Sequence, residues 1–154
     1  MNGVLVASLG NPLVADDGVG LAVIKKLEQR ELPAGVRLAD LGTDLLALSS
    51  HLDGIDKVIL IDAINFNGEP GELRRFDYRK LQAADGVEMK TAHGVNPLDA
   101  LALLAAAGIL KCEVILLGCQ PETLELGASL SPAVAAAVAK LIELVEAELK
   151  LPRR

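Results

Sequence analysis

Aromatic residues, cysteine and basic charge are all scarce in this chain of 154 residues. It has no Trp, one Tyr and two Phe, so we expect aliphatic side chains to fill the core. Its two cysteines, Cys112 and Cys119, flank an apolar run typical of a buried strand, and we expect two small apolar thiols with neither a disulfide nor a shared metal. The net charge of −6 argues against binding nucleic acid mainly through its phosphates, because that mode needs an excess of Lys and Arg.

Long hydrophobic runs and targeting signals are also missing. The longest apolar runs, at 100–110 and 126–139, fall short of the roughly 18 residues that cross a bilayer, and Pro132 interrupts the second. The first residues carry no basic segment and their apolar run ends at Gly10, which indicates no signal peptide. We therefore expect a cytoplasmic protein that does not enter a membrane. The length predicts one domain over 1–150, followed by a short tail at 151–154.

Short apolar runs alternate along the chain with segments of helical periodicity. The predicted strands are 4–9, 36–41, 57–62, 72–76 and 113–117, and the predicted helices are 17–30, 43–52, 96–107 and 132–150. We expect Thr43 to cap the helix at 43–52 and Asp16 or Asp17 to cap the one at 17–30. The order predicts an α/β three-layer sandwich, with a mostly parallel, twisted sheet of about five strands and helices on both faces. The polar and apolar alternation at 72–76 predicts an edge strand.

Polar residues collect where the predicted strands end. In open α/β sheets ligands bind beyond the carboxyl ends of the strands. A carboxylate there costs desolvation free energy unless it has a partner, although an aspartate may also cap a helix or a turn. Two carboxylates and an imidazole at one edge would suit a borderline divalent ion, with Zn²⁺, Mn²⁺ and Ni²⁺ not distinguished. The candidates are Asn11, Asp16, Asp17, Asp40, Asp62 and His93.

The segment 9–20, LGNPLVADDGVG, resembles the opening signature of the nickel–iron hydrogenase maturation endopeptidases. The likeness continues in order through later segments and covers nearly the whole chain. No single segment is specific, whereas the ordered set is. The later segments are 40–43, 58–63, 70–72, 91–93, 118–122 and 130–134.

This resemblance implies a cytoplasmic, monomeric hydrolase, an aspartic-type endopeptidase that removes the C-terminal extension of the hydrogenase large-subunit precursor after nickel insertion. Asp17, Asp62 and His93 would contact the metal, and Asp17 and Asp62 would also be catalytic. The nickel belongs to the substrate, so no cofactor of the chain's own is expected. Family members often have Glu at the position of Asp17 and Gly at that of Leu41, so the departure at Leu41 leaves the detailed role of its loop open.

Further contacts and the chemistry of cleavage are less specified. We place Asn11, Asp16 and Asp40 in substrate binding. Water activation has two routes, namely an aspartate as general base with Asn11 or loop amides at the oxyanion, or polarisation by the docked metal.

Two other functions fit parts of the same pattern. A nickel-binding chaperone that docks on the large subunit without cutting would use the same three ligands. The run 9–12, LGNP, also resembles the opening of peptidyl-tRNA hydrolases. That family needs a His and Asn pair shortly afterwards, where 14–17 reads VADD, and a basic surface for tRNA, which a net charge of −6 does not favour.

Overall fold

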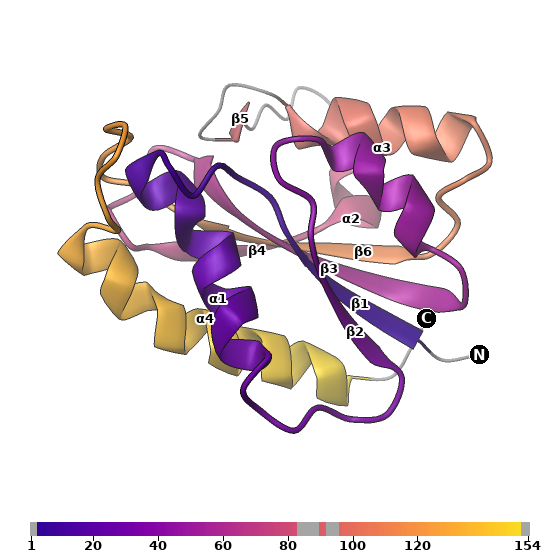
Figure 1. The fold of residues 1–154 in the computed structure, drawn as a ribbon. Coiled ribbons are helices and arrows are strands. Elements are labelled where there is room, and N and C mark those ends of the chain that lie inside the picture. Colours follow the sequence, from indigo (N-terminus) through magenta and orange to yellow (C-terminus); the bar gives the residue numbers. More distant parts are fainter. Residues whose placement is uncertain (1–2, 83–89, 92–95, 152–154) are drawn as a thin grey trace.

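The computed structural model describes residues 3–82, 90–91 and 96–151. Within these ranges the strands form one six-stranded sheet in the spatial order β2-β1-β3-β6-β4, with β5 paired to β3 (Figure 1). Strands β2, β1, β3 and β6 are parallel, whereas β4 and β5 pair antiparallel to β6 and β3. The strands are β1 (Gly3–Ser8), β2 (Val36–Asp40), β3 (Ile55–Asn65), β4 (Leu73–Asp77), β5 (Lys90–Thr91) and β6 (Glu113–Cys119).

Helices cover both faces of this sheet. On one face lie α1 and α4, and on the other lie η2, α2 and α3 (Figure 1). The helices are η1 (Ala15–Gly18, 3₁₀), α1 (Val19–Leu27), η2 (Leu45–His51, 3₁₀), α2 (Tyr78–Gln82), α3 (Pro97–Ala106) and α4 (Pro132–Lys150). The predicted three-layer α/β sandwich is confirmed, and so is the edge position of β4.

The central strand β3 is apolar on both faces, as a buried parallel strand should be. Ile59 and Ile61 pack in the core under α1 and α4, whereas Leu60 and Ile64 pack in the core under η2 and α3. Because side chains alternate along a strand, Asp62 points to the same face as Leu60 and Ile64. The strand therefore delivers one carboxylate to the η2 and α3 side, near the carboxyl end of the sheet.

Several local expectations are corrected by the structure. Asp44, not Thr43, caps η2, because its side chain accepts a hydrogen bond from the N–H of Leu46. Neither Asp16 nor Asp17 caps α1, which begins after Gly18 without a side-chain cap, since both aspartates lie inside the preceding η1. Helix α2 and strand β5 fall in a segment where we expected no element.

Cys112 and Cys119 are both free thiols, as expected. Burial raises the pKa of the Cys119 thiol to about 12, so this group stays protonated and packs as an apolar side chain. No helix within the described ranges is long and apolar enough to cross a membrane.

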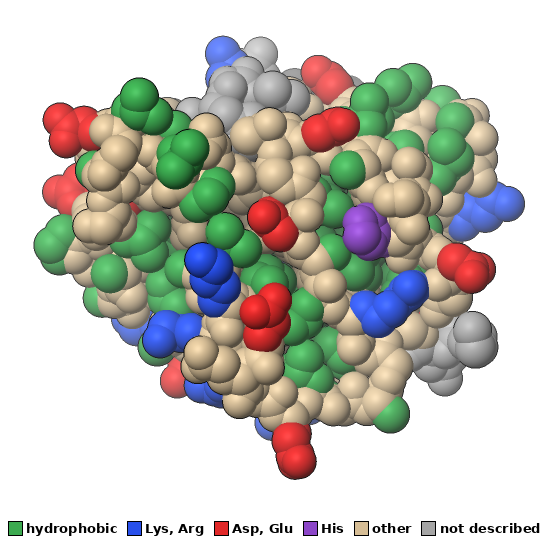
Figure 2. Space-filling view, in the orientation of Figure 1, with side chains coloured by type: hydrophobic (Ala, Val, Ile, Leu, Met, Phe, Trp, Pro, Cys, Tyr) green, Lys and Arg blue, Asp and Glu red, His purple; other side chains and the backbone are tan. Residues whose placement is uncertain are grey.

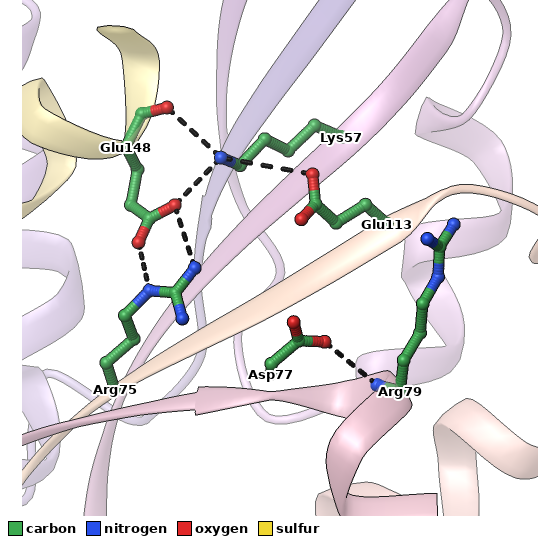
Figure 3. Close-up of polar contacts among 6 residues, drawn as sticks. All are labelled: Lys57, Arg75, Asp77, Arg79, Glu113 and Glu148. Atoms are coloured by element: carbon green, nitrogen blue, oxygen red, sulfur yellow. Dashed lines mark hydrogen bonds and ion pairs between the residues drawn. The ribbon is translucent and has the colours of Figure 1, made fainter. Parts of the chain in front are cut away.

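A buried charge cluster ties α4 to the other end of the sheet. Lys57 Nζ, at the amino end of β3, donates to the Oε2 of Glu148 at 2.8 Å and to its backbone oxygen at 3.1 Å. Arg75 of β4 pairs with the same carboxylate, and Glu113 of β6 lies 4.0 Å from Lys57 Nζ (Figure 3). Removing one partner of such a pair costs about 3–5 kcal/mol, so the cluster holds the fold at the end opposite to Asp62.

Candidate functional site

The loop after β1 folds back on itself and brings Asp17 to the carboxyl end of the sheet. Gly10 has a φ of +125°, and a Cβ there would lie 2.0 Å from the backbone oxygen of Asp17, so only glycine fits. The N–H of Asn11 then donates to Asp17 Oδ2 at 2.7 Å, and the Asn11 side chain accepts from the N–H of Leu13 at 3.0 Å. The loop fixes Asp17, which is almost fully buried, in one orientation.

Asp16 is fully buried and joins this loop to the segment 120–131. Its Oδ2 accepts from the N–H of Glu122 at 2.8 Å, the N–H of Thr123 at 3.0 Å and the hydroxyl of Ser131 at 2.8 Å. Its Oδ1 accepts from the N–H of Ser131 at 2.7 Å. Burial alone would raise the pKa of Asp16, but these hydrogen bonds outweigh it and the pKa is lowered. The carboxylate is thus charged and engaged inside the protein, and its predicted contact with substrate stays a prediction.

Asp62 is also buried, but its hydrogen bonding and the direction of its pKa shift differ from those of Asp16. Only 1% of the residue is exposed, and neither carboxylate oxygen has a hydrogen-bond partner in the part of the chain that the structure describes. Burial, followed by the negative charge of Asp17, raises its pKa well above the ordinary 3.8, against a weaker opposing effect of the Ala63 backbone. Burial thus favours the protonated form of this carboxyl group, whereas a bound cation would favour its ionised form.

The remaining predicted residues divide between the site and its surroundings. Asp40 ends β2 beside β1, and its Oδ1 accepts from Ser8 Oγ and from the N–H of Gly42, both at 3.0 Å, so it shapes an exposed turn. His93 lies outside the described residues. Over the described ranges no group of three His, Cys, Asp or Glu side chains could hold a metal ion. The structure brings Asp17 and Asp62 together, and the predicted third donor remains a prediction.

Gln120 lies in the segment 118–122 that carries part of the family resemblance, although the sequence alone gave this residue no role. It directly follows β6, and its Oε1 accepts from the N–H groups of Phe66 at 2.9 Å and Gly68 at 3.1 Å. Its Nε2 donates to Asn65 Oδ1 at 3.2 Å. Gln120 therefore holds the loop after β3 in place, and the available signal was a polar residue at the end of an apolar strand.

A pocket of about 260 Å³ opens on the η2 and α3 face, the face to which Asp62 points. Its wall is mainly apolar, which suits a nonpolar side chain of a ligand more than a charged group. The lining residues include Leu9, Leu45, Leu46, Thr91, Pro97 and Ala100.

Comparisons with known proteins show the family of the chain. A model of the HycI family, described as hydrogenase maturation protease, matches residues 21–148. The hydrogenase expression/formation protein HupD of Rhodobacter capsulatus is 37% identical over 134 residues, which are 86% of this chain and 64% of HupD. HoxM of Azotobacter vinelandii is 35% identical over 123 residues, 79% of this chain and 59% of HoxM. The chain thus spans less than two thirds of the length of these curated relatives.

A solved structure matches over nearly its full length. The NiFe hydrogenase maturation protease HybD of Thermococcus kodakarensis shares 32% identity with a TM-score of 0.80, over 96% of this chain and 99% of that one. The fold and the site define a class, an α/β sandwich with two buried carboxylates at the carboxyl end of its sheet, on Asp17 of η1 and Asp62 of β3. The chain belongs to the hydrogenase maturation protease family. The resemblance found in the sequence is confirmed, and the peptidyl-tRNA hydrolase alternative loses its support.

Proposed function

We propose that this chain is an endopeptidase that removes the C-terminal extension of the nickel–iron hydrogenase large-subunit precursor after nickel insertion. It reads the nickel held by the precursor and needs no cofactor of its own. The observation that carries the proposal is the buried carboxylate of Asp62, without a hydrogen-bond partner among the described residues and close enough to Asp17 for that charge to raise its pKa. In a member of a maturation protease family, such a group is most simply a ligand for something that arrives with the substrate.

A divalent cation supplies what this environment lacks. Its charge compensates both the desolvation of Asp62 and the repulsion from Asp17, so the ion replaces the proton on Asp62. Nickel is borderline in softness and accepts carboxylate oxygen together with imidazole nitrogen. His93 is the proposed third ligand. It follows Thr91 by two residues, and Thr91 pairs with Ile64, two residues beyond Asp62.

Recognition of the metal makes cleavage conditional on nickel insertion. If two added metal contacts contribute about 3 kcal/mol, the protein prefers the nickel-loaded precursor by roughly a hundredfold. The same contacts align the scissile bond with the site, which lowers the entropic part of the barrier. The apolar pocket on this face leaves room for a nonpolar side chain of the precursor tail.

The reaction needs a group that activates water, and two routes start from this site. In the first, Asp17 or Asp62 acts as general base, the aspartic-type route, with Asn11 or loop amides donating to the oxyanion. In the second, the nickel of the substrate polarises the carbonyl or the water. We propose further that the chain acts as a monomer in the cytoplasm, as the family resemblance implies.

Mass spectrometry of candidate large-subunit precursors tests the proposal. The wild-type protein should shorten the nickel-loaded precursor and leave the nickel-free one intact. Asp62→Asn and His93→Ala should each cleave at least about tenfold more slowly, since each removes one of the metal contacts that together give the hundredfold preference. Asp53→Asn, at an exposed aspartate before the amino end of β3, is the matched control and should cleave normally.

Two results would count against the proposal. Full cleavage of the precursor by Asp62→Asn and His93→Ala would show that these two side chains do not form the site. A stable wild-type complex with loaded precursor that never becomes shorter would favour the nickel-binding chaperone instead.

A further inference from the structure

Large apolar side chains stand exposed on two loops next to the carboxylates. Leu13, between β1 and η1, is 66% exposed, while Leu124 and Leu126, between β6 and α4, are 42% and 81% exposed. We call these three leucines the apolar tip. Figure 2 shows hydrophobic side chains gathered over the same two segments, with acidic side chains at their margin. Single exposed leucines are ordinary on protein surfaces, whereas a group carried by two joined loops indicates a contact surface.

The apolar tip is held rigidly although it is exposed. Val14 and Leu126 form an isolated antiparallel bridge, and the N–H of Gly127 donates to the backbone oxygen of Leu13 at 2.7 Å. The four hydrogen bonds to Asp16 fix both loops from below. Because the backbone is ordered before any partner arrives, binding here loses little conformational entropy.

A hollow of about 230 Å³ lies beside the apolar tip, between the start of α1 and the segment before α4. Its wall is mainly apolar, and Lys25 of α1 also lines it. The combination of projecting leucines and an adjoining hollow allows a partner both to receive and to insert side chains, as the well-packed centres of protein interfaces do. The apolar residues that line it are Pro12, Ala15, Leu21, Ala22 and Leu130.

Hydrogen bonds connect the apolar tip to the proposed site of nickel recognition. Leu13 donates its N–H to the side chain of Asn11, whose own N–H donates to Asp17 Oδ2. Two consecutive hydrogen bonds therefore connect Leu13 to Asp17. A partner that binds to Leu13 is held at a fixed position relative to the Asp17 carboxylate. The exposed carboxylates of Glu122 and Glu125 lie in the same loop as Leu126, so a surface edged by Lys or Arg complements this one.

We propose that the apolar tip and its hollow dock the folded body of the large-subunit precursor, through an apolar surface of the precursor edged by basic residues. This inference rests on the proposed function, but it concerns a contact separate from the tail and the metal. The docked precursor places its nickel over Asp17 and Asp62. The apolar tip then provides affinity for the precursor, and the metal provides selection of its nickel-loaded form.

Calorimetric titration of nickel-loaded precursor into the full-length protein tests this docking. The Leu13→Ser/Leu126→Ser variant should bind at least about tenfold more weakly, because a partner can no longer bury these side chains. Its KM should rise in parallel, while kcat stays within about twofold of the wild type. Leu103→Ser is the matched control, since Leu103 lies on α3 and is 58% exposed, and it should bind as the wild type does.

Each other outcome has a defined meaning. Unchanged affinity and KM in the double variant would overturn the docking and leave the protease proposal intact. Wild-type dimers in sedimentation that the double variant loses, with equal affinity for the precursor, would make the apolar tip a self-association surface and also overturn it. Docking that depends on the apolar tip, without any cleavage of loaded precursor, would support this inference and refute the proteolytic function.

Discussion

Asp16 and Asp62 lie at the same end of the sheet, are equally inaccessible to solvent, and have opposite surroundings. Asp16 accepts four hydrogen bonds and its pKa is lowered. Asp62 has no hydrogen-bond partner for either oxygen among the residues described, and its pKa is raised. Both are buried, so the opposite directions of the two pKa shifts come from the hydrogen-bond donors around Asp16 and from the negative charge of Asp17 beside Asp62.

We infer from this difference that Asp16 has a structural role, in keeping with the proposal that Asp62 is a ligand. The donors around Asp16 come from one distant loop, so its charge is used to hold that loop. Asp62 costs the fold free energy in its ionised state, and the backbone of Ala63 offsets only a smaller part of that cost. A buried group that destabilises its own fold is expected where a ligand supplies the compensation.

The largest expected effect is that of Asp16→Ala. It would leave the buried N–H and hydroxyl of Ser131 and the partly buried N–H groups of Glu122 and Thr123 without their acceptor, and we expect a loss of about 3–5 kcal/mol in the free energy of unfolding. Urea denaturation measures this loss. Asp44→Ala, which removes the exposed cap of η2, is the control and should cost only about 1 kcal/mol. Equal losses in the two variants would show that the Asp16 hydrogen bonds contribute little.

Asp62→Asn should have a smaller effect of the opposite sign on stability. Between pH 3.8 and the raised pKa of Asp62 the folded state keeps a proton that the unfolded state releases, so wild-type stability falls as pH rises through this window. The amide that replaces the carboxyl group in this variant cannot ionise. The stability of the variant relative to that of the wild type should therefore increase with rising pH. We expect equal melting temperatures near pH 4 and a variant about 2–4 °C more stable near pH 8, the effect of about 1 kcal/mol.

The measurement is thermal unfolding across this pH range, with Asp53→Asn as the control that should show no such trend. A destabilised Asp62→Asn protein near pH 8 would mean that the native carboxylate is stabilised by partners after all.

Ser131→Ala should have an effect similar in size to that of Asp62→Asn. It removes one of the four donors to Asp16 and keeps the backbone N–H of the same residue, so we expect a loss of about 1 kcal/mol. Asp16 has a lowered pKa, so its contribution is complete above its ordinary pKa and is lost as pH falls through the lowered value. Ser131→Ala should therefore matter less in acid than near pH 7, which urea denaturation at both values can check.

The sequence predicted the layers of this fold because apolar periodicity reports directly on burial. Strand β3 was predicted at 57–62 and extends to Asn65, since its last residues pair with β5, an element of two residues that no periodic pattern can indicate. The placement of Asp17 and Asp62 at one end followed from parallel strands sharing a direction. The difference between Asp16 and Asp62 could not be predicted from the sequence. It depends on backbone N–H groups that contact Asp16 from positions more than 100 residues away in the sequence.

The wrong prediction of the η2 cap also arose because local sequence does not specify the path of the backbone. Thr43 and Asp44 are adjacent and both suit a helix cap, and only the backbone path selects Asp44. Gln120 was overlooked as an individual residue because its partners lie in the loop after β3, beyond the reach of local patterns.

Titration of the side-chain carboxyl carbons by NMR tests the central contrast most directly. One ¹³C experiment on the wild-type protein without precursor follows both aspartates. We predict that Asp62 titrates well above 3.8 and Asp16 below it, with Asp16→Asn and Asp62→Asn spectra assigning the two signals. An Asp62 signal that titrates at or below 3.8 would show a carboxylate already stabilised by the fold, and would contradict its assignment as an open ligand for the nickel of the precursor.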